Sequence, residues 1–155
     1  MGFLDKLKSA GKALTGGQAD VSLEFPPQPV ARGQPFKVRV TVRSTGGEVK
    51  SEGVYIDLMA REIGNLNGNG QCGTCQQSVS APVKIDKETF NQQFTVGPAF
   101  VLGANETKVF DGQVTIPPNY QGTYMGSVNH NWQIRGRMEA FGNDPDTGFQ
   151  TLIVK

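Results

Sequence analysis

From Thr123 to Phe141 the chain reads TYMGSVNHNWQIRGRMEAF, and alternate positions of this stretch form two chemically distinct sets. One set is mainly apolar: Tyr124, Val128, His130, Trp132, Ile134, Met138 and Ala140. The other set is polar or charged: Ser127, Asn129, Asn131, Gln133, Arg135, Arg137 and Glu139. Because successive side chains of a strand point to opposite faces, the pattern predicts one long β-strand with one buried face. Such strands are typical of antiparallel sheets, which favours an all-β fold over an α/β enzyme.

Shorter segments with the same alternation lie on both sides of this stretch. We expect strands over Ala19–Phe25, Phe36–Arg43, Val54–Glu62, Glu88–Val96, Glu106–Ile116 and Phe149–Val154. Proline, glycine and Asn-Asp turns separate most of them, as between the strands of an immunoglobulin-like antiparallel β-sandwich. The segment Gly64–Ser78 is rich in glycine and nearly free of large apolar residues, so we expect a long exposed loop or hairpin tip there.

Length and charge restrict the class of protein further. The chain has 155 residues, which fits one domain, and we expect a single sandwich over residues 18–155. It carries 15 Lys and Arg against 14 Asp and Glu, a net charge of +1, which argues against a general nucleic-acid binder. The first residues lack the apolar run of a secretory signal, and the chain lacks an apolar stretch long enough to cross a membrane. We therefore expect a cytoplasmic protein.

The first 17 residues are predicted to form a short amphipathic helix over residues 2–15, followed by a Gly-Gly linker. Its apolar side chains are Phe3, Leu4, Leu7 and Leu14, with lysines on the flanks. An isolated helix of this length is marginal in water, so it needs a surface to lie on. The four apolar side chains suffice for docking on a protein and give only weak peripheral binding to a membrane, so we favour a protein contact.

Several of these segments resemble the arrestin superfamily. The turn Val30–Pro35 stands where arrestins have a proline-glycine-acidic turn before a valine-rich strand, and Val54–Leu58 supplies a further matching strand. His130-Asn131-Trp132 with Asp144-Pro145 downstream is similar to the bacterial sporulation-control branch of that superfamily, which also begins with a short helix rich in Phe and Lys. Arrestins contain two sandwiches, and this chain has the length for one. The resemblance implies a protein–protein adaptor without enzymatic activity, often working near membranes.

The pair Cys72 and Cys75, separated by Gly73 and Thr74, is the sharpest local motif. Two cysteines at this spacing are half of a tetrahedral zinc site. The chain has no other cysteine, and its single histidine is His130, so a zinc ion shared between two copies of the chain would complete the site. The alternatives are free thiols or a small disulfide, which is the simplest interpretation, and a redox pair. A redox pair is normally found at the start of a helix rather than in a glycine-rich loop.

Five basic residues are candidates for partner contact. Lys37, Arg39 and Arg43 share one strand face and Arg135 and Arg137 share another, so neighbouring strands would give a basic surface. The alternative is a solvated outer face that also keeps sheets from pairing edge to edge. His130 lies on the apolar side of its strand, where we expect a core histidine with a backbone partner rather than a catalyst.

These observations predict a non-enzymatic cytoplasmic adaptor or scaffold, with no cofactor other than a zinc ion at Cys72 and Cys75. Its predicted partner is a protein, bound through the N-terminal helix and the exposed sheet faces. The alternatives are a self-assembling structural subunit, and a small metal or redox protein that uses the cysteine pair.

Overall fold

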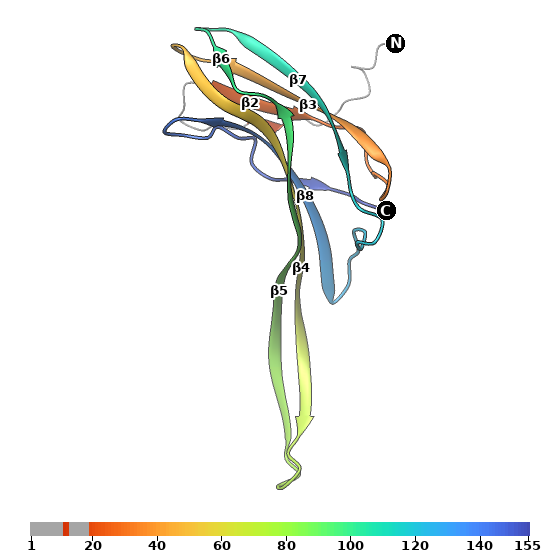
Figure 1. Ribbon diagram of the computed structural model, residues 1–155. Helices are drawn as coiled ribbons and strands as arrows, with labels where there is room; N and C mark the ends of the chain where they lie inside the picture. Colours follow the sequence, from red (N-terminus) through yellow and green to blue (C-terminus); the bar gives the residue numbers. More distant parts are fainter. Residues whose placement is uncertain (1–10, 13–18) are drawn as a thin grey trace.

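The computed structural model describes residues 11–12 and 19–155, which form two antiparallel β-sheets packed on each other (Figure 1). The first sheet has the order β1-β2-β3-β7 and contains β1 (Gly11–Lys12), β2 (Ala19–Glu24), β3 (Pro35–Ser44) and β7 (Thr107–Thr115). The second has the order β5-β4-β8-β9 and contains β4 (Val49–Gln71), β5 (Ser78–Gly97), β8 (Val128–Ala140) and β9 (Gln150–Leu152), with β6 (Phe100–Leu102) pairing with β4. The predicted all-β sandwich is confirmed.

Alternation along the strands builds the core between the two sheets. The first sheet contributes the buried side chains of Val38, Val40 and Val42 of β3 to this core. The second sheet contributes residues that are 0% exposed: Val54, Ile56, Leu58, Ala60, Trp132, Ile134 and Met138. The Trp132 ring packs on the Phe90 ring at 5.1 Å between centroids, and its indole N–H donates to the Gln121 carbonyl at 2.9 Å. A buried indole therefore keeps its hydrogen bond while filling the core.

Gly136 lets the two sheets approach closely at the middle of β8. A Cβ atom there would lie 3.3 Å from Cβ of Leu23 and 3.5 Å from Cγ2 of Val40, both on the opposite sheet. Most residues would crowd these atoms, since a packed core has little free volume. The glycine in the alternating pattern thus marks the place where the layers touch.

The predicted strand over Thr123–Phe141 is correct in its second part and too long at its start. β8 begins at Val128, and Tyr124 instead forms an isolated bridge with His130 at the end of a tight turn. In this turn the Gly126 N–H donates to the Asn129 side-chain oxygen at 2.9 Å. Tyr124 is therefore 39% exposed, although its position in the alternation predicted burial.

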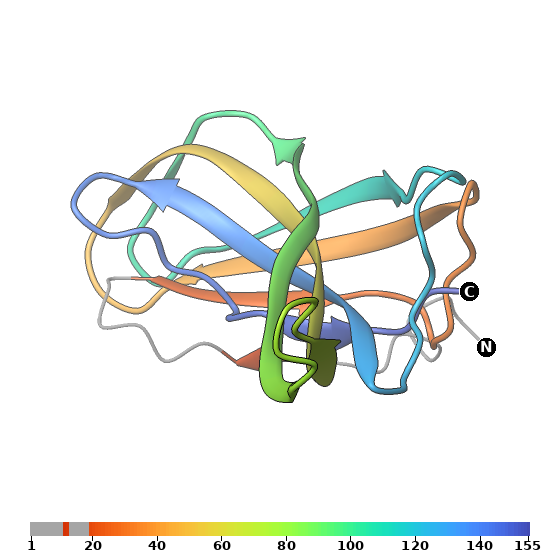
Figure 2. The same ribbon diagram turned by 90° about the horizontal axis from the view of Figure 1, so that it is seen from below.

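Of the two alternatives predicted for Gly64–Ser78, an exposed loop or a hairpin tip, the structure shows the second: the segment is the outer part of a β-hairpin. β4 and β5 stay paired residue by residue from Arg61 opposite Glu88 to Gln71 opposite Ser78. Only Cys72–Gln77 form the connecting turn. This hairpin projects well beyond the sandwich in Figure 1, and Figure 2 looks along it from its tip.

The helix predicted over residues 2–15 lies almost wholly outside the described residues. Of that segment the structure describes Gly11 and Lys12, and these two residues pair with Leu23 and Ser22 of β2 as a short strand rather than continuing a helix. The described part of the chain holds no helix of the length and apolarity that a membrane span requires.

Replacing Leu58 with alanine tests the core. Leu58 is fully buried on β4, opposite Ile134 of β8, so Leu58→Ala should lower the free energy of unfolding by about 2–5 kcal/mol through lost burial and the cavity left behind. Urea unfolding followed by the fluorescence of Trp132, the single tryptophan of the chain, measures this loss. The matched control is Val109→Ala, because Val109 is 52% exposed and should change stability by less than about 0.5 kcal/mol. Equal losses in the two variants would contradict this core.

Candidate functional site

The outer half of the β4–β5 hairpin contributes no residue to the described core of the sandwich. We call residues 63–83 the arm. β8 pairs with β4 only as far as Gly64, and beyond that point β4 and β5 have only each other as strand partners among the described residues. At about 3.3 Å per residue, the paired part from Gly64 to Gln71 extends about 23 Å. None of the buried apolar residues of the described core lies between Ala60 and Phe90, so the arm is an addition to a complete sandwich.

A β-bulge marks the base of the arm. Ala60 pairs with Phe90 and Arg61 with Glu88, so Thr89 is left without a Cα partner in β4. The Thr89 hydroxyl instead lies 2.7 Å from Nε2 of the buried His130. Gly64 is needed just beyond, because a Cβ atom there would lie 2.5 Å from the Ser127 carbonyl oxygen.

The two faces of the arm differ in chemistry. In the sandwich, the even-numbered residues Ile56, Leu58 and Ala60 of β4 face the core. The even-numbered residues further along β4 lie on the same side of the strand. In the arm and at its base, this side carries Gly64, Leu66 and Gly68 of β4 opposite Ile85, Val83 and Ala81 of β5. The other side carries Asn65, Asn67, Asn69 and Gln71. Leu66 is 38% and Val83 47% exposed, so the apolar side of the arm lies open to solvent.

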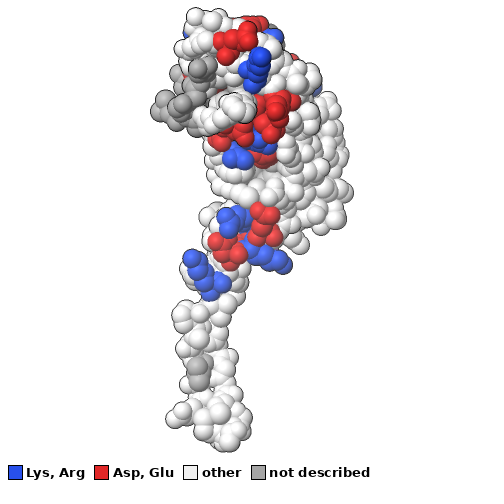
Figure 3. Space-filling model, turned by 60° about the vertical axis from the view of Figure 1, so that its left-hand side comes forward, with Lys and Arg blue, Asp and Glu red and all other residues white. Residues whose placement is uncertain are grey.

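The arm also carries no charge. No Asp, Glu, Lys or Arg occurs from Ile63 to Val83, whereas charged residues gather where the arm leaves the sandwich (Figure 3). There Arg61 and Asp86 form an ion pair at 2.6 Å across the two strands. A partner that contacts the arm therefore meets an uncharged ribbon with charged residues at its base. We call these charged residues, which include Arg61 and Asp86, the collar.

Cys72 and Cys75 lie at the far end of the arm, in the turn. The Cys75 N–H donates to Sγ of Cys72 at 3.3 Å, the Cys72 N–H donates to the Gln77 carbonyl at 2.9 Å, and the Gln76 N–H donates to the Cys72 carbonyl at 2.9 Å. Gln76 adopts a φ of 53°, which closes the turn. Both thiols are free, with Cys72 half-buried and Cys75 exposed. Among the described residues, no group of three or more metal-binding side chains forms around them.

The hydrogen bonds of the turn lower the pKa of Cys72, so its thiol loses its proton more readily than that of an ordinary cysteine. A hydrogen bond from the Cys75 thiol, followed by hydrogen bonds from the backbone N–H groups of Cys75, Thr74 and Gln76, lowers the pKa of Cys72 to about 7. Hydrogen bonds to the charged form stabilise it, which is the usual way in which turns activate a thiol. At neutral pH a substantial share of Cys72 is therefore ready to bind a metal ion or react.

The five basic residues predicted for partner contact do not form one surface. Lys37, Arg39 and Arg43 belong to β3 of the first sheet, and Arg135 and Arg137 belong to β8 of the second. Arg39 forms a two-point pair with Asp111 of β7, at 2.6 and 3.0 Å. The two predicted halves therefore lie on the outer faces of opposite layers.

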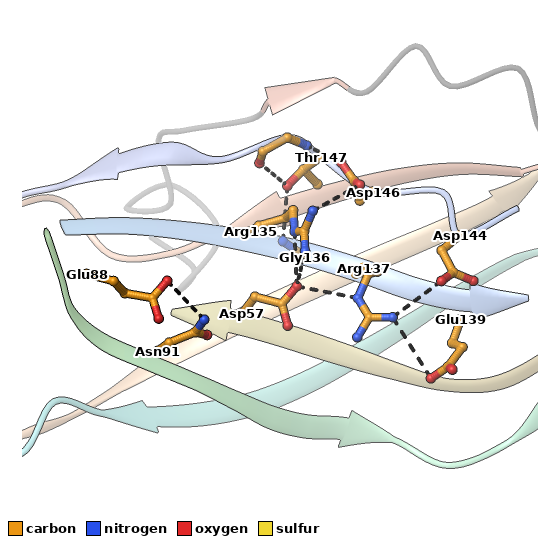
Figure 4. A network of polar contacts seen from close by, with 11 residues as sticks. Asp57, Glu88, Asn91, Arg135, Gly136, Arg137, Glu139, Asp144, Asp146 and Thr147 are labelled. Carbon is orange, nitrogen blue, oxygen red and sulfur yellow. Dashed lines mark hydrogen bonds and ion pairs between the residues drawn. The ribbon is translucent and has the colours of Figure 1, made fainter. Parts of the chain in front are cut away.

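Arg135 and Arg137 sit in a network of acidic residues on β4, β8 and the segment after β8 (Figure 4). Both contact Oδ2 of Asp57, Arg135 at 2.7 Å and Arg137 at 3.4 Å. Arg135 also reaches Asp146 at 3.4 Å, and Arg137 reaches Asp144 at 3.6 Å. Each guanidinium in addition stacks on an aromatic ring, Arg135 on Phe149 and Arg137 on Tyr55. These contacts hold the segment after β8 against the sheet and neutralise the two arginines.

His130 has a structural role, as predicted. It is 1% exposed, and its Nδ1 lies 2.9 Å from the Gly122 carbonyl, which can only accept. In the neutral imidazole Nε2 then accepts from the Thr89 hydroxyl. Both ring nitrogens are therefore occupied by hydrogen bonds.

The remaining predicted contact residues, Phe3, Leu4, Leu7 and Leu14, lie outside the described residues. An exposed hairpin tip was one of the predicted alternatives, but the continuous strand pairing of the arm was not predicted, because glycine and asparagine are usually found in loops. The pattern that identifies it is the regular alternation of Asn65, Asn67, Asn69 and Gln71 with Gly64, Leu66, Gly68 and Gly70.

The fold is similar to that of a solved bacterial protein. The crystal structure of Spo0M, a sporulation control protein from Bacillus subtilis, matches 90% of this chain with a TM-score of 0.63 at 15% sequence identity. The chain spans about half of that protein, since the match covers 50% of it. No family model and no curated protein sequence matches the chain. At this identity the similarity establishes the arrestin-like fold, in agreement with the resemblance noted in the sequence.

The reactivity of Cys72 tests the geometry of the turn. Because the thiolate is the nucleophile and its pKa is lowered, alkylation of Cys72 by iodoacetamide should rise with pH and reach half its maximum near pH 7. Mass spectrometry of the peptide after timed labelling gives the rate. Cys75→Ala removes the largest cause of the shift and should move the midpoint to higher pH. A midpoint of about 8.5 in the native chain, that of an ordinary cysteine, would contradict this geometry.

The Asp57 network is tested by Asp57→Asn. This change takes away the charge that two half-buried arginines share, so it should lower the free energy of unfolding by about 1–3 kcal/mol. Glu139→Gln is the control, because Glu139 lies 3.9 Å from Arg137 and its side chain is 39% exposed, against 12% for Asp57, and the change should cost less than about 0.5 kcal/mol. Urea unfolding of both variants measures the difference. A loss for Asp57→Asn no larger than that for Glu139→Gln would show that the network does not stabilise the sheet.

Proposed function

We propose that the protein is a non-enzymatic adaptor that holds a partner protein through the apolar side of its arm. One observation carries the proposal: the core-facing side of β4 continues beyond the sandwich as an exposed, uncharged surface. In the sandwich this side is covered by the first sheet. In the arm, Leu66 and Val83 on this side stay 38% and 47% exposed.

The arm is a two-stranded ribbon that has no further strand partner among the described residues. A two-stranded ribbon with open edges is at best marginally stable in water, because it buries little apolar surface against the entropy of ordering its residues. Leu66 lies opposite Val83, with Gly64 and Gly68 beside it on β4 and Ala81 next to Val83 on β5, so another sheet or ribbon can approach this side closely. Covering this side with a partner adds the missing layer.

The chemistry of the partner follows from the arm. Burying an unpaired charge against apolar groups is costly, so the matching surface is apolar and uncharged at its centre. The collar at the base, with the ion pair of Arg61 and Asp86, presents both signs of charge. It supplies the polar rim that surrounds the centre of many protein interfaces.

The absence of enzymatic activity is part of the proposal and is supported by the site of His130. The single histidine of the chain is buried and makes two hydrogen bonds within the fold. The arrestin-like fold is a further support by analogy, since folds do not by themselves determine activity. A cytoplasmic location fits the two free thiols, which stay reduced there.

The contact elements predicted from the sequence stay part of the proposal. These are the segment 2–15, for a protein or a weak peripheral membrane contact, and the outer faces that carry Lys37, Arg43 and Arg39. The second candidate function is a self-assembling structural subunit. It is favoured by the same uncharged arm, which two copies can bring together without repulsion between like charges.

A pair of matched arm variants tests the adaptor. A photo-reactive residue at position 83 links the partner to the apolar side of the arm in cells, and the partner is identified from the linked product. The partner is then purified by itself, and its affinity for each variant of the chain is measured by titration. Leu66→Asp places a charge on the apolar side and should weaken binding at least tenfold, about 1.4 kcal/mol. Asn67→Asp adds the same charge to the polar side and should change the affinity by less than about threefold. The titrations are run with a chelator and a reductant.

Removing the arm gives the outcome that would sink the proposal. Joining Asn65 to Lys84, which are paired across the hairpin, by Asn-Gly should leave the sandwich folded, because the described core residues all lie outside the removed segment. Circular dichroism and a thermal scan check the fold of each variant. Full affinity in the armless chain, or equal losses for Leu66→Asp and Asn67→Asp, would reject the arm as the binding element.

A further inference from the structure

The turn at the tip of the arm already has the arrangement that a metal-bound cysteine pair requires. Its backbone N–H of Cys75 points at Sγ of Cys72, and the thiol of Cys75 is close enough to hydrogen-bond to the same sulfur. Two sulfurs held on one short turn, with N–H groups directed at them, offer two adjacent corners of a tetrahedron. Soft thiolate ligands of this kind select zinc over hard cations.

The chain cannot fill the other two corners with residues of the same kind. It contains two cysteines and one histidine, and His130 is enclosed in the sandwich with both ring nitrogens bonded. Around the tip, no Asp, Glu or His occurs from Ile63 to Val83. Among the described residues, the pair can therefore supply two of the four ligands of a tetrahedral zinc site.

We propose that Cys72 and Cys75 of two copies of this chain bind one zinc ion between them, joining the two molecules tip to tip through their arms. A two-fold axis through the metal adds the same cysteine pair from the second copy and so gives four sulfur ligands, which is the ligand set of a closed structural zinc site. The joined species has two sandwiches at opposite ends of a rod formed by two arms.

Two features of the arm favour a second copy as the source of the missing ligands. The arm is uncharged, so two identical tips approach without the repulsion that a charged segment would meet in its own copy. The tip also stands clear of the sandwich, so the two bodies do not collide when the tips meet (Figure 1).

The protons balance simply. Each of the four thiols loses its proton to solvent as it binds the metal, and no electron is transferred.

This inference goes beyond the proposed adaptor and uses different residues. The adaptor depends on the side of the arm that carries Leu66 and Val83, and the zinc link depends on the two cysteines of the turn. Leu66→Asp should lose the partner and keep the zinc-linked pair, whereas Cys72→Ser should do the reverse. Failure of one idea is thus visible separately from failure of the other.

The test is sedimentation velocity of the full chain in a phosphine reductant, titrated with zinc, together with native mass spectrometry. We expect a monomer in chelator and a dimer that reaches its plateau at one zinc ion per two chains. Cys72→Ser and Cys75→Ser should each stay monomeric at the same zinc concentration, and the control Thr74→Ser, which keeps both thiols, should pair as the native chain does. X-ray absorption at the zinc edge should show four sulfur ligands at about 2.3 Å.

Several results would overturn the proposal. They are a monomer that binds zinc one to one, a chain that retains no zinc through desalting, and a zinc shell with nitrogen or oxygen ligands. A dimer that forms equally in chelator, or equally in the double variant Cys72→Ser/Cys75→Ser, would assign pairing to another surface and also reject it. Circular dichroism of the serine variants guards against loss of fold, and the absorption measurement on the native chain does not depend on any variant.

Discussion

The pairing of β4 with β8 is the constraint on which the rest of the molecule depends. From Val54 opposite Met138 to Ala60 opposite Trp132, this ladder runs through the centre of the second sheet, and its inward residues are fully buried. On the outer side Asp57 of the same strand joins Arg135 and Arg137 of the other. Because β4 is fixed on both faces here, its continuation past Gly64 leaves the sandwich in a defined direction.

Much of the fold is predictable from the sequence, and for a clear reason. Where one face of a strand is buried, apolar residues must recur at every second position, and Phe36–Arg43 and Val54–Ala60 show this without interruption. The same rule overextends β8, because the turn that carries Tyr124 and Gly126 preserves the alternation by chance. Pattern alone cannot separate a strand from a turn that is tied down by a side chain such as Asn129.

The candidate site was only partly predictable. Cys72 and Cys75 stand out by type and spacing, but their position at the end of a projecting ribbon depends on the pairing of Gly64–Gln71 with Ser78–Ile85. Glycine and asparagine form that ribbon against their usual preference, since the strands on which it continues hold it in register. Likewise, the separation of Lys37 from Arg135 follows from which strands share a sheet, and local sequence does not determine that.

The single unpaired residue at the base of the arm has an effect far from its own position. If the register of Ala60 with Phe90 ran on without the bulge at Thr89, Leu66 would lie opposite Lys84 and Gly68 opposite Pro82. Lys84 and Pro82 would then join Leu66 on one side of the ribbon, and Ile85 and Val83 would join the asparagines on the other, because a slip of one residue turns a strand over. The extra residue Thr89, whose hydroxyl contacts the buried imidazole of His130, thus sets the register of the whole arm. This register places the apolar side chains of the arm on one side and the asparagines on the other.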